Sequence, residues 1–455
     1  MDVRPTPRVP VSSVSARGAR SLAAFSVAAL CACGSPGDTE VGSDSEVTGT
    51  TGTPEASASF GTTDSETAQE TDDEPGAPAP WIATWGSSPT EANAATVAPF
   101  VLEGQSLRQV AHISVGGEEV RVRLANTFGE SDLPVTEARL ALAGEGAATL
   151  PASDRLLTVD GATSFLIPAG AIVVSDPVAL EVPARSDLSV SLYFAERVMT
   201  TTVHAEAHQT AWLASGDLGA ASSWPAMAET RTSAFWLNGI EVKAPSDAAL
   251  VVALGDSITD GAGSTLDANR RWPDRLAERL LAEPALEPGA VAVVNAGVGG
   301  NCVLRYFIGP PALERFDRDV LDQRGVRWVI ITEGINDIGV GSFLGQPVAA
   351  DELIAGYLEL IARAHARGLL VYGGTLLPYE GAYYYSEDGE QVRQAVNEWI
   401  RTSGEYDAVI DFDVVTRDPD APARLLPEYD AGDHLHPSDA GYAAMANAVE
   451  LALFW

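Results

Sequence analysis

The fold is decided by the stretch Leu250-Val-Val-Ala-Leu-Gly-Asp-Ser-Ile-Thr-Asp-Gly261, in which an apolar run leads into a tight turn that carries a serine. Four more apolar runs follow along the chain, and helical patterns such as 272–281 and 351–367 separate them. These four runs are Val291–Val294, Val326–Ile331, Leu369–Tyr372 and Ala408–Phe412. Nearly continuous apolar strands that alternate with helices indicate a parallel sheet covered on both faces. The functional loops of such a sheet lie beyond the carboxyl ends of its strands.

Residues 81–245 show a different pattern, in which short runs of β-forming residues are broken by Gly, Pro, Asp and Asn. Val120-Arg-Val-Arg-Leu124 and Leu188-Ser-Val-Ser-Leu192 alternate strictly between apolar and polar residues, which is typical of half-buried strands. No long helical pattern occurs in this part of the sequence. We therefore expect an all-β, sandwich-like domain at 81–245, followed by an α/β domain at 246–455.

The first 80 residues carry a targeting pattern and then a low-complexity stretch. Positive charges at Arg17 and Arg20 precede a short apolar run, which is typical of an export signal and too short to span a bilayer. Residues 30–33, Leu-Cys-Ala-Cys, resemble a bacterial lipobox, which implies a signal at 1–33 and a lipid on Cys33; ordinary cleavage and secretion are the alternative. Residues 34–80 contain no Lys or Arg and are expected to form a disordered acidic linker. Both interpretations place the protein outside the cytoplasm.

The composition limits the kinds of partner and cofactor. The 455 residues include 28 basic and 63 acidic side chains, so the formal net charge is −35 and the surface should repel nucleic acid. Only Cys31, Cys33 and Cys302 are present, too few for a disulfide framework or a cysteine-based zinc site. We therefore expect no nucleic-acid partner, no cofactor and no metal, and membrane contact only through a lipid on Cys33.

The loops after the apolar runs contain side chains suited to nucleophilic catalysis. They are Gly255–Gly261, Asn295-Ala-Gly-Val-Gly-Gly-Asn301, Gly334-Ile-Asn-Asp-Ile-Gly339 and, near the C-terminus, Asp430-Ala-Gly-Asp-His-Leu-His-Pro437. An alcohol becomes a good nucleophile when a base removes its proton, and that base needs a carboxylate to fix its tautomer. We assign these three roles to Ser257, His436 and Asp433.

The negative charge that develops on an attacked carbonyl oxygen needs hydrogen-bond donors that are already in place. The candidates are the N–H groups of Ser257 and Gly300 and the side-chain amide of Asn336. The sequence does not separate Gly300 from Gly299 in this role.

His434 is the rival base and Asp430 the rival carboxylate. His434 directly follows Asp433 and is too near to fold back onto it, whereas the three-residue spacing to His436 leaves room for a hydrogen bond from Nδ1. The cluster could also be read as a metal site, but no His-x-x-x-His or cysteine set supports closed coordination, so we predict no metal there; its members are Asp430, Asp433, His434 and His436.

The order Gly255-Asp-Ser-Ile, Gly-x-Asn-Asp and Asp-x-x-His resembles the SGNH or GDSL-like hydrolase superfamily. Its four name-giving residues match Ser257, Gly300, Asn336 and His436. The resemblance covers about 247–455 and implies a flavodoxin-like, three-layer α/β fold and a serine esterase.

A finer resemblance rests on Trp81-Ile-Ala-Thr-Trp85 and Arg271-Trp-Pro-Asp274, which are similar to a bacterial subgroup of arylesterases, acylhydrolases and acetylxylan esterases with an N-terminal β-domain. One departure is Gly299, where many relatives carry Ser.

The expected activity is hydrolysis of short acyl esters, acetyl above all, on small molecules or polysaccharides. The alternatives are a lysophospholipase or thioesterase, and a glycan-binding surface lipoprotein whose hydrolase domain has decayed. An α/β-hydrolase is disfavoured because the serine lies outside a Gly-x-Ser-x-Gly turn. Candidate substrate contacts are Arg271, Trp272, Asn301, Tyr306, Tyr379 and Tyr383 to Tyr385.

Overall fold

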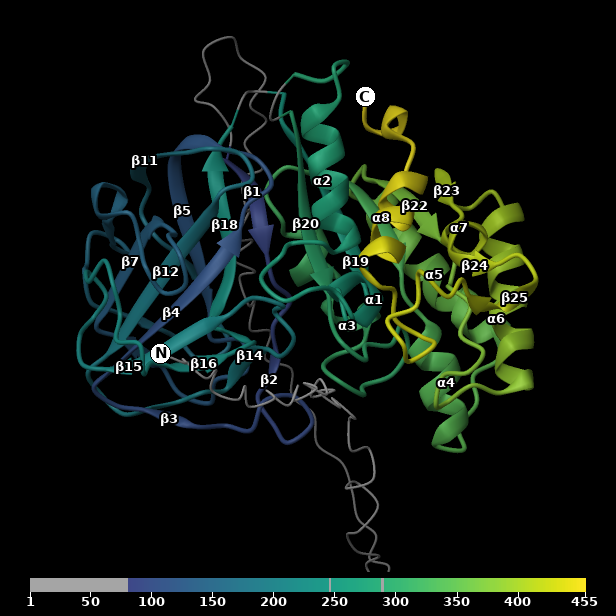
Figure 1. Cartoon of the computed structure of the whole chain (residues 1–455), viewed down its shortest axis with the longest axis horizontal. Coiled ribbons are helices and arrows are strands. Elements are labelled where there is room, and N and C mark those ends of the chain that lie inside the picture. The colour runs from purple at the N-terminus through teal and green to yellow at the C-terminus, as the bar shows by residue number, and fades with distance from the viewer. Residues whose placement is uncertain (1–80, 245–246, 288–289) are drawn as a thin grey trace, which may run out of the picture. The chain divides into compact units, whose positions relative to one another are not determined.

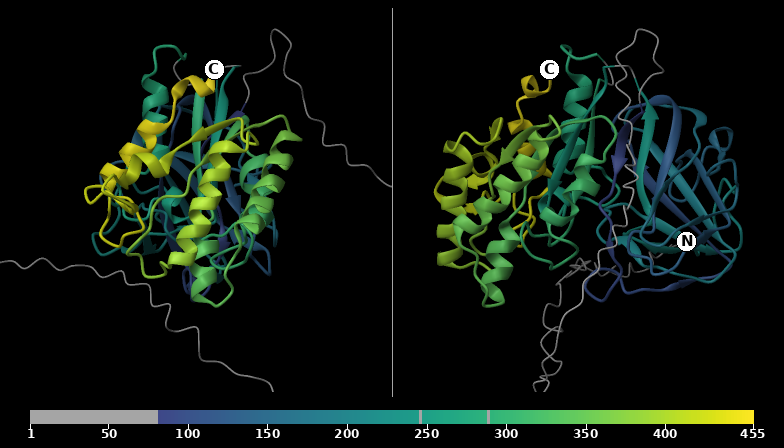
Figure 2. Two further views of the ribbon diagram at one scale, coloured as in Figure 1. Left: turned by 90° about the vertical axis from the view of Figure 1, so that its right-hand side faces the viewer. Right: turned by 180° about the vertical axis from the view of Figure 1, so that it is seen from behind.

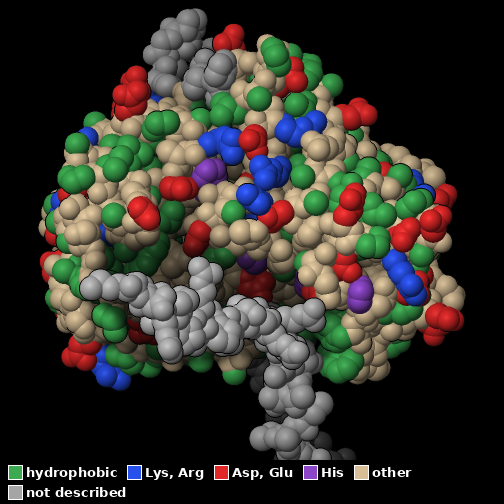
Figure 3. Space-filling view, viewed as in Figure 1, with side chains coloured by type: hydrophobic (Ala, Val, Ile, Leu, Met, Phe, Trp, Pro, Cys, Tyr) green, Lys and Arg blue, Asp and Glu red, His purple; other side chains and the backbone are tan. Residues whose placement is uncertain are grey.

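The structure is a computed structural model that describes residues 81–244, 247–287 and 290–455, all of which belong to one compact unit. The predicted export signal, Cys33 and the predicted linker at 34–80 lie outside these residues. Within the described ranges, no helix combines the length and apolar character needed to cross a membrane. Acidic side chains are spread over the face seen in Figure 3 and do not gather into one patch.

Two antiparallel sheets form most of the N-terminal domain (Figure 1). One contains β1 (Trp81–Gly86), β18 (Leu237–Lys243), β5 (Gly117–Ala125), β10 (Ile172–Val174) and β11 (Val178–Val182). The other contains β16 (Glu229–Arg231), β15 (Ala211–Ser215), β4 (Gln105–His112), β12 (Asp187–Phe194), β7 (Glu137–Leu142) and β8 (Arg155–Leu157). The apolar side chains of β5 and β12 belong to the same hydrophobic core. The prediction of a β-rich domain ahead of the α/β domain is confirmed.

Small sheets complete this domain. Their strands are β2 (Thr90–Glu91), β3 (Val101–Leu102), β6 (Leu133–Val135), β9 (Phe165–Ile167), β13 (Val198–Met199), β14 (Thr202–His204) and β17 (Ala234–Phe235), with one 3₁₀ turn at Pro151–Ser153.

The prediction of a half-exposed face for Leu188–Leu192 is wrong. Ser189 and Ser191 are buried like the apolar residues between them. Strand β12 lies between β4 and β7, and the Arg108 side chain covers its polar face by donating to Ser191 Oγ (2.8 Å) and to loop carbonyls, among them that of Gly219 (2.8 Å). The alternating pattern therefore predicts the strand correctly, but it does not predict that one side of the strand faces solvent.

The C-terminal domain is built on a parallel sheet of order β20-β19-β21-β22-β23, as the sequence predicted. Its strands are β19 (Ala249–Gly255), β20 (Val291–Gly297), β21 (Val326–Thr332), β22 (Leu370–Gly374) and β23 (Ala408–Ile410). The strand order reverses at β19, so the loops after β19, β20 and β21 meet at a topological switch point, where ligands bind in folds of this kind.

Helices cover the sheet on both faces (Figures 1 and 2). They are α1 (Ser257–Asp260), α2 (Trp272–Ala282), α3 (Ala312–Phe316), α4 (Ile335–Phe343), α5 (Ala350–His365), α6 (Glu387–Thr402), α7 (Phe412–Thr416) and α8 (Asp439–Ala448). A π-helical turn at Asp317–Leu321 extends α3, a 3₁₀ turn at Leu451–Phe454 follows α8, and β24 (Arg417–Asp418) pairs with β25 (Ala421–Leu425). Helix α2 packs on α8 and β20, while α5 packs on α6 and β22.

The two domains are in direct contact, with strand β1 packed against β20. The N–H of Val293 in β20 donates to Ser114 Oγ after β4 (3.1 Å), and the N–H of Ala83 in β1 donates to the carbonyl of Arg324 before β21 (3.1 Å). Gly86 is necessary in this contact, because a Cβ there would lie 2.7 Å from a methyl carbon of Val294. The packing brings the segment after β14 next to α1.

Candidate active site

The turn after β19 presents Ser257 at the start of α1. Asp256 caps this helix by accepting from the N–H of Ile258 (2.9 Å), and Gly261 ends it in the left-handed conformation (φ 114°). Gly255 has no space for a side chain, because a Cβ would collide with Thr259 and with the carbonyl of Thr332. The sharp strand-to-helix turn leaves the Ser257 N–H without an acceptor among the described residues.

Ser257, His436 and Asp433 form a continuous chain of contacts. Ser257 Oγ lies 2.8 Å from His436 Nε2, and His436 Nδ1 lies 2.6 Å from Asp433 Oδ2. The other carboxylate oxygen accepts from the backbone N–H groups of His436 (2.9 Å) and Leu435 (3.0 Å). Four contacts therefore fix the carboxylate and the imidazole relative to the serine.

The charges of this chain favour a base that is steadied by an anion. Burial would lower the pKa of His436, but the hydrogen bond and the charge of Asp433 outweigh burial and raise it. Partial burial would raise the pKa of Asp433, yet its contacts with His436 and the backbone lower it to about 2. Asp433 is thus ionised throughout the range in which His436 titrates.

His434 belongs to a separate pair. Its Nδ1 lies 2.7 Å from Asp430 Oδ2, and its N–H donates to Asp430 Oδ1 (3.0 Å). Its backbone is left-handed (φ 64°), which turns the ring toward Gly381. The structure therefore places the two histidines of the loop on two different aspartates.

The loop after β20 distinguishes the two adjacent glycines. The N–H of Gly299 donates to Asp260 Oδ2 (3.0 Å), whereas the N–H of Gly300 has no acceptor among the described residues. Gly300 has a left-handed backbone (φ 72°), and a Cβ there would lie 2.7 Å from Ile308. Gly300 is therefore the glycine with a backbone donor available for a ligand.

Asn336 lies in the first turn of α4 with its amide oriented by two contacts. Its Nδ2 donates to the carbonyl of Asn301 (2.9 Å), and its Oδ1 accepts from the hydroxyl of Tyr384 (3.3 Å). These contacts fix which atom is nitrogen, and the second hydrogen on Nδ2 stays available.

Arg315 is a buried residue that the sequence analysis did not single out. Its guanidinium donates to the carbonyl of Gly255 (2.9 Å), the carbonyl of Ala296 (2.7 Å) and Asn301 Oδ1 (2.8 Å). It also pairs with Glu333 at 3.2 Å. The Arg315 side chain thus connects the turn that carries Ser257 to the glycine loop after β20. No local sequence motif predicts this role.

The structure buries the predicted substrate contacts Arg271, Trp272 and Asn301, and their side chains make contacts within the protein. Trp272 has no exposed surface and packs on Phe412 (ring centroids 5.6 Å apart), while Arg271 holds Asp274 with two hydrogen bonds of 2.8 and 3.0 Å. The start of α2 faces the core and not the solvent. Asn301 donates to the carbonyl of Pro310 (2.8 Å) and accepts from Arg315, so its amide is occupied.

The predicted aromatic contacts divide by exposure. Tyr379 is fully buried, whereas Tyr306 and Tyr383 are 53% and 65% exposed. Tyr383 contacts Tyr384 (ring centroids 4.6 Å apart) and the exposed Phe343 (6.4 Å). The exposed rings of Tyr383 and Phe343 therefore lie close to the residue that orients Asn336.

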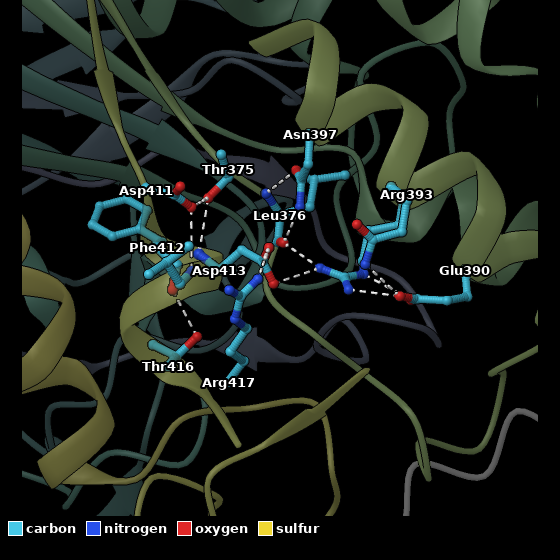
Figure 4. Close-up of polar contacts among 12 residues, drawn as sticks. Thr375, Leu376, Glu390, Arg393, Asn397, Asp411, Phe412, Asp413, Thr416 and Arg417 are labelled. Carbon is cyan, nitrogen blue, oxygen red and sulfur yellow. Dashed lines mark hydrogen bonds and ion pairs between the residues drawn. The ribbon is translucent and has the colours of Figure 1, made fainter. Parts of the chain in front are cut away.

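A buried polar cluster holds the chain that leads to these tyrosines (Figure 4). The carbonyl of Leu376 accepts from Arg393 Nη1 (2.9 Å) and Asn397 Nδ2 (2.8 Å), and Asn397 Oδ1 accepts from its N–H (2.7 Å). Arg393 also pairs with Asp413 (2.9 Å) and with Glu390 (2.7 Å). These partners satisfy one another, which makes the cluster a support for the segment after β22.

The N-terminal domain also reaches the site, which the sequence analysis missed. His204 Nε2 lies 2.9 Å from Asp260 Oδ1, and the Glu206 carboxylate packs on Gly299, where a Cβ would lie 3.1 Å from its Oε2. Burial and the charge of Asp260 raise the pKa of Glu206, and burial lowers the pKa of His208 to about 4. The spacing His204-Ala-Glu-Ala-His208 was the available signal.

Cys302 is fully buried, and burial raises the pKa of its thiol, so the cysteine packs as an apolar residue.

Residues 253–444 match the model of the GDSL-like lipase/acylhydrolase family. This part of the chain is a domain of that family, as the resemblance implied, and the protein is a hydrolase of the esterase type. No curated protein matches the sequence.

Among solved structures, the chain is similar to a lipolytic protein of the G-D-S-L family from Desulfitobacterium hafniense (22% identity over 44% of this chain and 97% of that chain, TM-score 0.34). It is also similar to a GDSL-like lipase from Bacteroides thetaiotaomicron (20% identity, 45% and 87%, TM-score 0.34). A third is a catalytic mutant of an acetylxylan esterase from Geobacillus stearothermophilus (24% identity, 44% and 91%, TM-score 0.34).

Proposed function

We propose that the protein hydrolyses short-chain acyl esters, acetyl esters above all, through an acyl-enzyme on Ser257. The observation that carries this proposal is the chain from Ser257 Oγ through His436 to Asp433, with contacts of 2.8 and 2.6 Å. Beside it lie the N–H groups of Ser257 and Gly300, which have no acceptor among the described residues.

In the proposed mechanism His436 takes the proton of Ser257 as the hydroxyl attacks the ester carbonyl. The N–H groups of Ser257 and Gly300 and the Asn336 amide then donate to the oxyanion; removal of one such donor typically costs about 3 kcal/mol of transition-state stabilisation. The imidazolium returns its proton to the leaving alcohol, and a water attacks the acyl-enzyme by the same route. Asp433 stabilises the imidazolium in both halves of the reaction.

The surroundings of the donors favour a small acyl group. Ile308 packs directly on Gly300, and Tyr384 packs on Gly339 and reaches Asn336. Bulky side chains beside two of the three proposed donors favour a short acyl chain over a long one. The exposed rings of Tyr383 and Phe343 could stack on a sugar or an aryl alcohol, so the alcohol part is proposed to be an acylated polysaccharide or a small molecule.

A chain-length series of aryl esters, from acetate to dodecanoate, tests this proposal together with acetylated xylan. We expect kcat/KM to be highest for acetate, and the xylan to release acetic acid. Ser257→Ala is the matched control, since it removes only the attacking oxygen. A preference for long chains would indicate a lipid acylhydrolase, and no turnover of any ester by the wild-type protein would indicate a decayed, glycan-binding protein.

We further propose that the protein is exported and anchored through a lipid on Cys33, on the strength of the sequence of residues 17–33. Cys33→Ser should release the protein from the membrane fraction. Mass spectrometry that finds an unmodified N-terminus beyond residue 33 would contradict this proposal.

A further inference from the structure

Three side chains meet beside the catalytic loops without forming hydrogen bonds to one another. Glu206 and His208 come from the segment after β14 of the N-terminal domain, and Asp260 comes from the last residue of α1. One potential ligand atom of each lies within 4.8 Å of the other two. We propose that Glu206, His208 and Asp260 bind one divalent cation, with Zn²⁺ as the preferred metal.

The spacing suits a single ion. Zinc lies about 2.1 Å from nitrogen and oxygen ligands, so ligand atoms in its tetrahedral arrangement are about 3.4 Å apart. The three donors would therefore have to approach one another by at most about 1.4 Å. Among the described residues, no hydrogen bond holds the Glu206 carboxylate, so it can close the remaining gap by a small rotation.

The lone pairs that a cation needs are free. Five of the six histidines of the sequence lie beside an aspartate, in the pairs His112–Asp187, His204–Asp260, His365–Asp407, His434–Asp430 and His436–Asp433. His208 is the exception. Its Nε2 is completely buried and has no hydrogen-bond partner within the described ranges. A water or an ion can satisfy a buried polar atom of this kind, and the two neighbouring carboxylates favour a cation.

The negative charges of the two carboxylates also favour a cation at this site. Glu206 and Asp260 together carry two negative charges when ionised, and no Lys or Arg of the described chain forms a hydrogen bond or ion pair with either of them. His204, held as a cation beside Asp260, offsets one of these charges, and a metal ion would offset the other.

Asp260 is already oriented by neighbours that would form an outer shell. His204 Nε2 lies 2.9 Å from one carboxylate oxygen, and the N–H of Gly299 donates to the other (3.0 Å). Each oxygen keeps a second lone pair for a metal. Outer hydrogen bonds of this kind are typical of metal-ligating carboxylates.

The combination of one imidazole and two carboxylates favours zinc over calcium and magnesium. Calcium and magnesium prefer sites made entirely of oxygen, whereas an imidazole together with carboxylates suits zinc. Three protein ligands leave at least one position for water. The ion would link the N-terminal domain to α1 and to the loop that carries Gly299 and Gly300, so its role would be to position these elements.

The test is zinc binding by the EDTA-treated full chain, followed by isothermal titration and elemental analysis. We expect one equivalent of Zn²⁺ to bind and to raise the melting temperature, because a ligand that binds only the folded state stabilises it. Glu206→Gln and His208→Ala should weaken binding at least tenfold. His365→Ala and His436→Ala are matched controls that each lose an imidazole, and they should bind zinc like the wild type.

Glu206→Gln keeps the shape of the side chain and decides the matter if His208→Ala fails to fold. The proposal is wrong if the wild type binds no zinc, if Glu206→Gln binds as tightly as the wild type, or if His436→Ala is the variant that loses the ion. It is equally wrong if zinc does not bind and Glu206→Gln instead raises KM for an acetylated oligosaccharide, because the free donors would then contact substrate.

Discussion

Two aspartate–histidine pairs flank the nucleophile helix, and their third partners differ. In the C-terminal domain, His436 lies between Asp433 (2.6 Å) and the hydroxyl of Ser257 (2.8 Å). Across the domain contact, His204 lies between Asp260 (2.9 Å) and the backbone carbonyl of Ser88 (2.9 Å).

The third partner decides what each imidazole can do. A carbonyl and a carboxylate only accept, so both ring nitrogens of His204 must donate and the ring is held as a cation. Burial lowers the pKa of His204, but the charge and hydrogen bond of Asp260 outweigh it and raise the pKa. A hydroxyl can donate, so His436 can stay neutral with a free lone pair on Nε2. The same pair therefore serves as a fixed ion pair in one place and as a candidate base in the other.

The largest expected loss of activity comes from removing the Ser257 hydroxyl, the partner that His436 has and His204 lacks. Ser257→Ala should reduce kcat for an aryl acetate by about 10⁶-fold, as for other serine nucleophiles. The melting temperature should change little, because the Ser257 hydroxyl contacts His436 and no other described side chain. Near-normal turnover by a folded variant would contradict the proposed mechanism.

The next effect separates the two histidines of one loop. His436→Ala should lower kcat by about 10⁴-fold or more. His434→Ala should keep kcat within about tenfold of the wild type, because its ring pairs with Asp430 and not with Asp433. Steady-state kinetics of both variants on the same acetate checks this. If His434→Ala is inactive while His436→Ala still turns over substrate, the base is wrongly assigned.

Asp433→Asn tests what the carboxylate contributes to the candidate base. The amide should lower kcat by about 10⁴-fold, because it no longer favours the tautomer with a free Nε2. In the wild type, kcat/KM should rise with pH through a pKa above the usual His value of about 6.5, since Asp433 raises the pKa of His436 and only the neutral ring accepts the serine proton. In Asp433→Asn this acidic limb should move to lower pH. An unchanged limb would show that another group controls it.

The sequence predicted the parts of this site that depend on local pattern. Apolar runs that end in Gly255-Asp-Ser or Gly-x-Asn-Asp identify strands and the loops after them, because burial on both faces of a parallel sheet leaves a continuous apolar signal. The side-chain direction at the start of α2 does not follow from such a pattern, so Trp272 was expected in a cleft although it packs in the core.

Contacts between residues that are distant in the sequence do not follow from local pattern either. His204 and Asp260 are 56 residues apart, and no sequence pattern in either segment predicts their contact. Arg315 joins Gly255 and Asn301 from a helix that carries no motif. Both contacts join residues that are far apart in the sequence, so they depend on tertiary packing and leave no pattern in either segment.

The smallest effect on catalysis is expected from the His204–Asp260 pair, which joins the two domains. His204→Ala leaves the buried Asp260 carboxylate with the N–H of Gly299 but without its imidazolium. Removing one partner of a buried ion pair typically costs about 3 kcal/mol, and we expect a loss of this size in the free energy of unfolding, measured by urea denaturation. The contacts among Ser257, His436 and Asp433 do not include His204, so kcat should fall by less than about a hundredfold through loosening of the Gly299–Gly300 loop.

His112→Ala is the matched control, because His112 pairs with Asp187, whose side chain is 46% exposed, and surface pairs typically contribute less than about 1 kcal/mol. Equal losses of stability in His204→Ala and His112→Ala would mean that His204 is not held as a buried cation. The proposed difference in protonation between His204 and His436 would then be wrong.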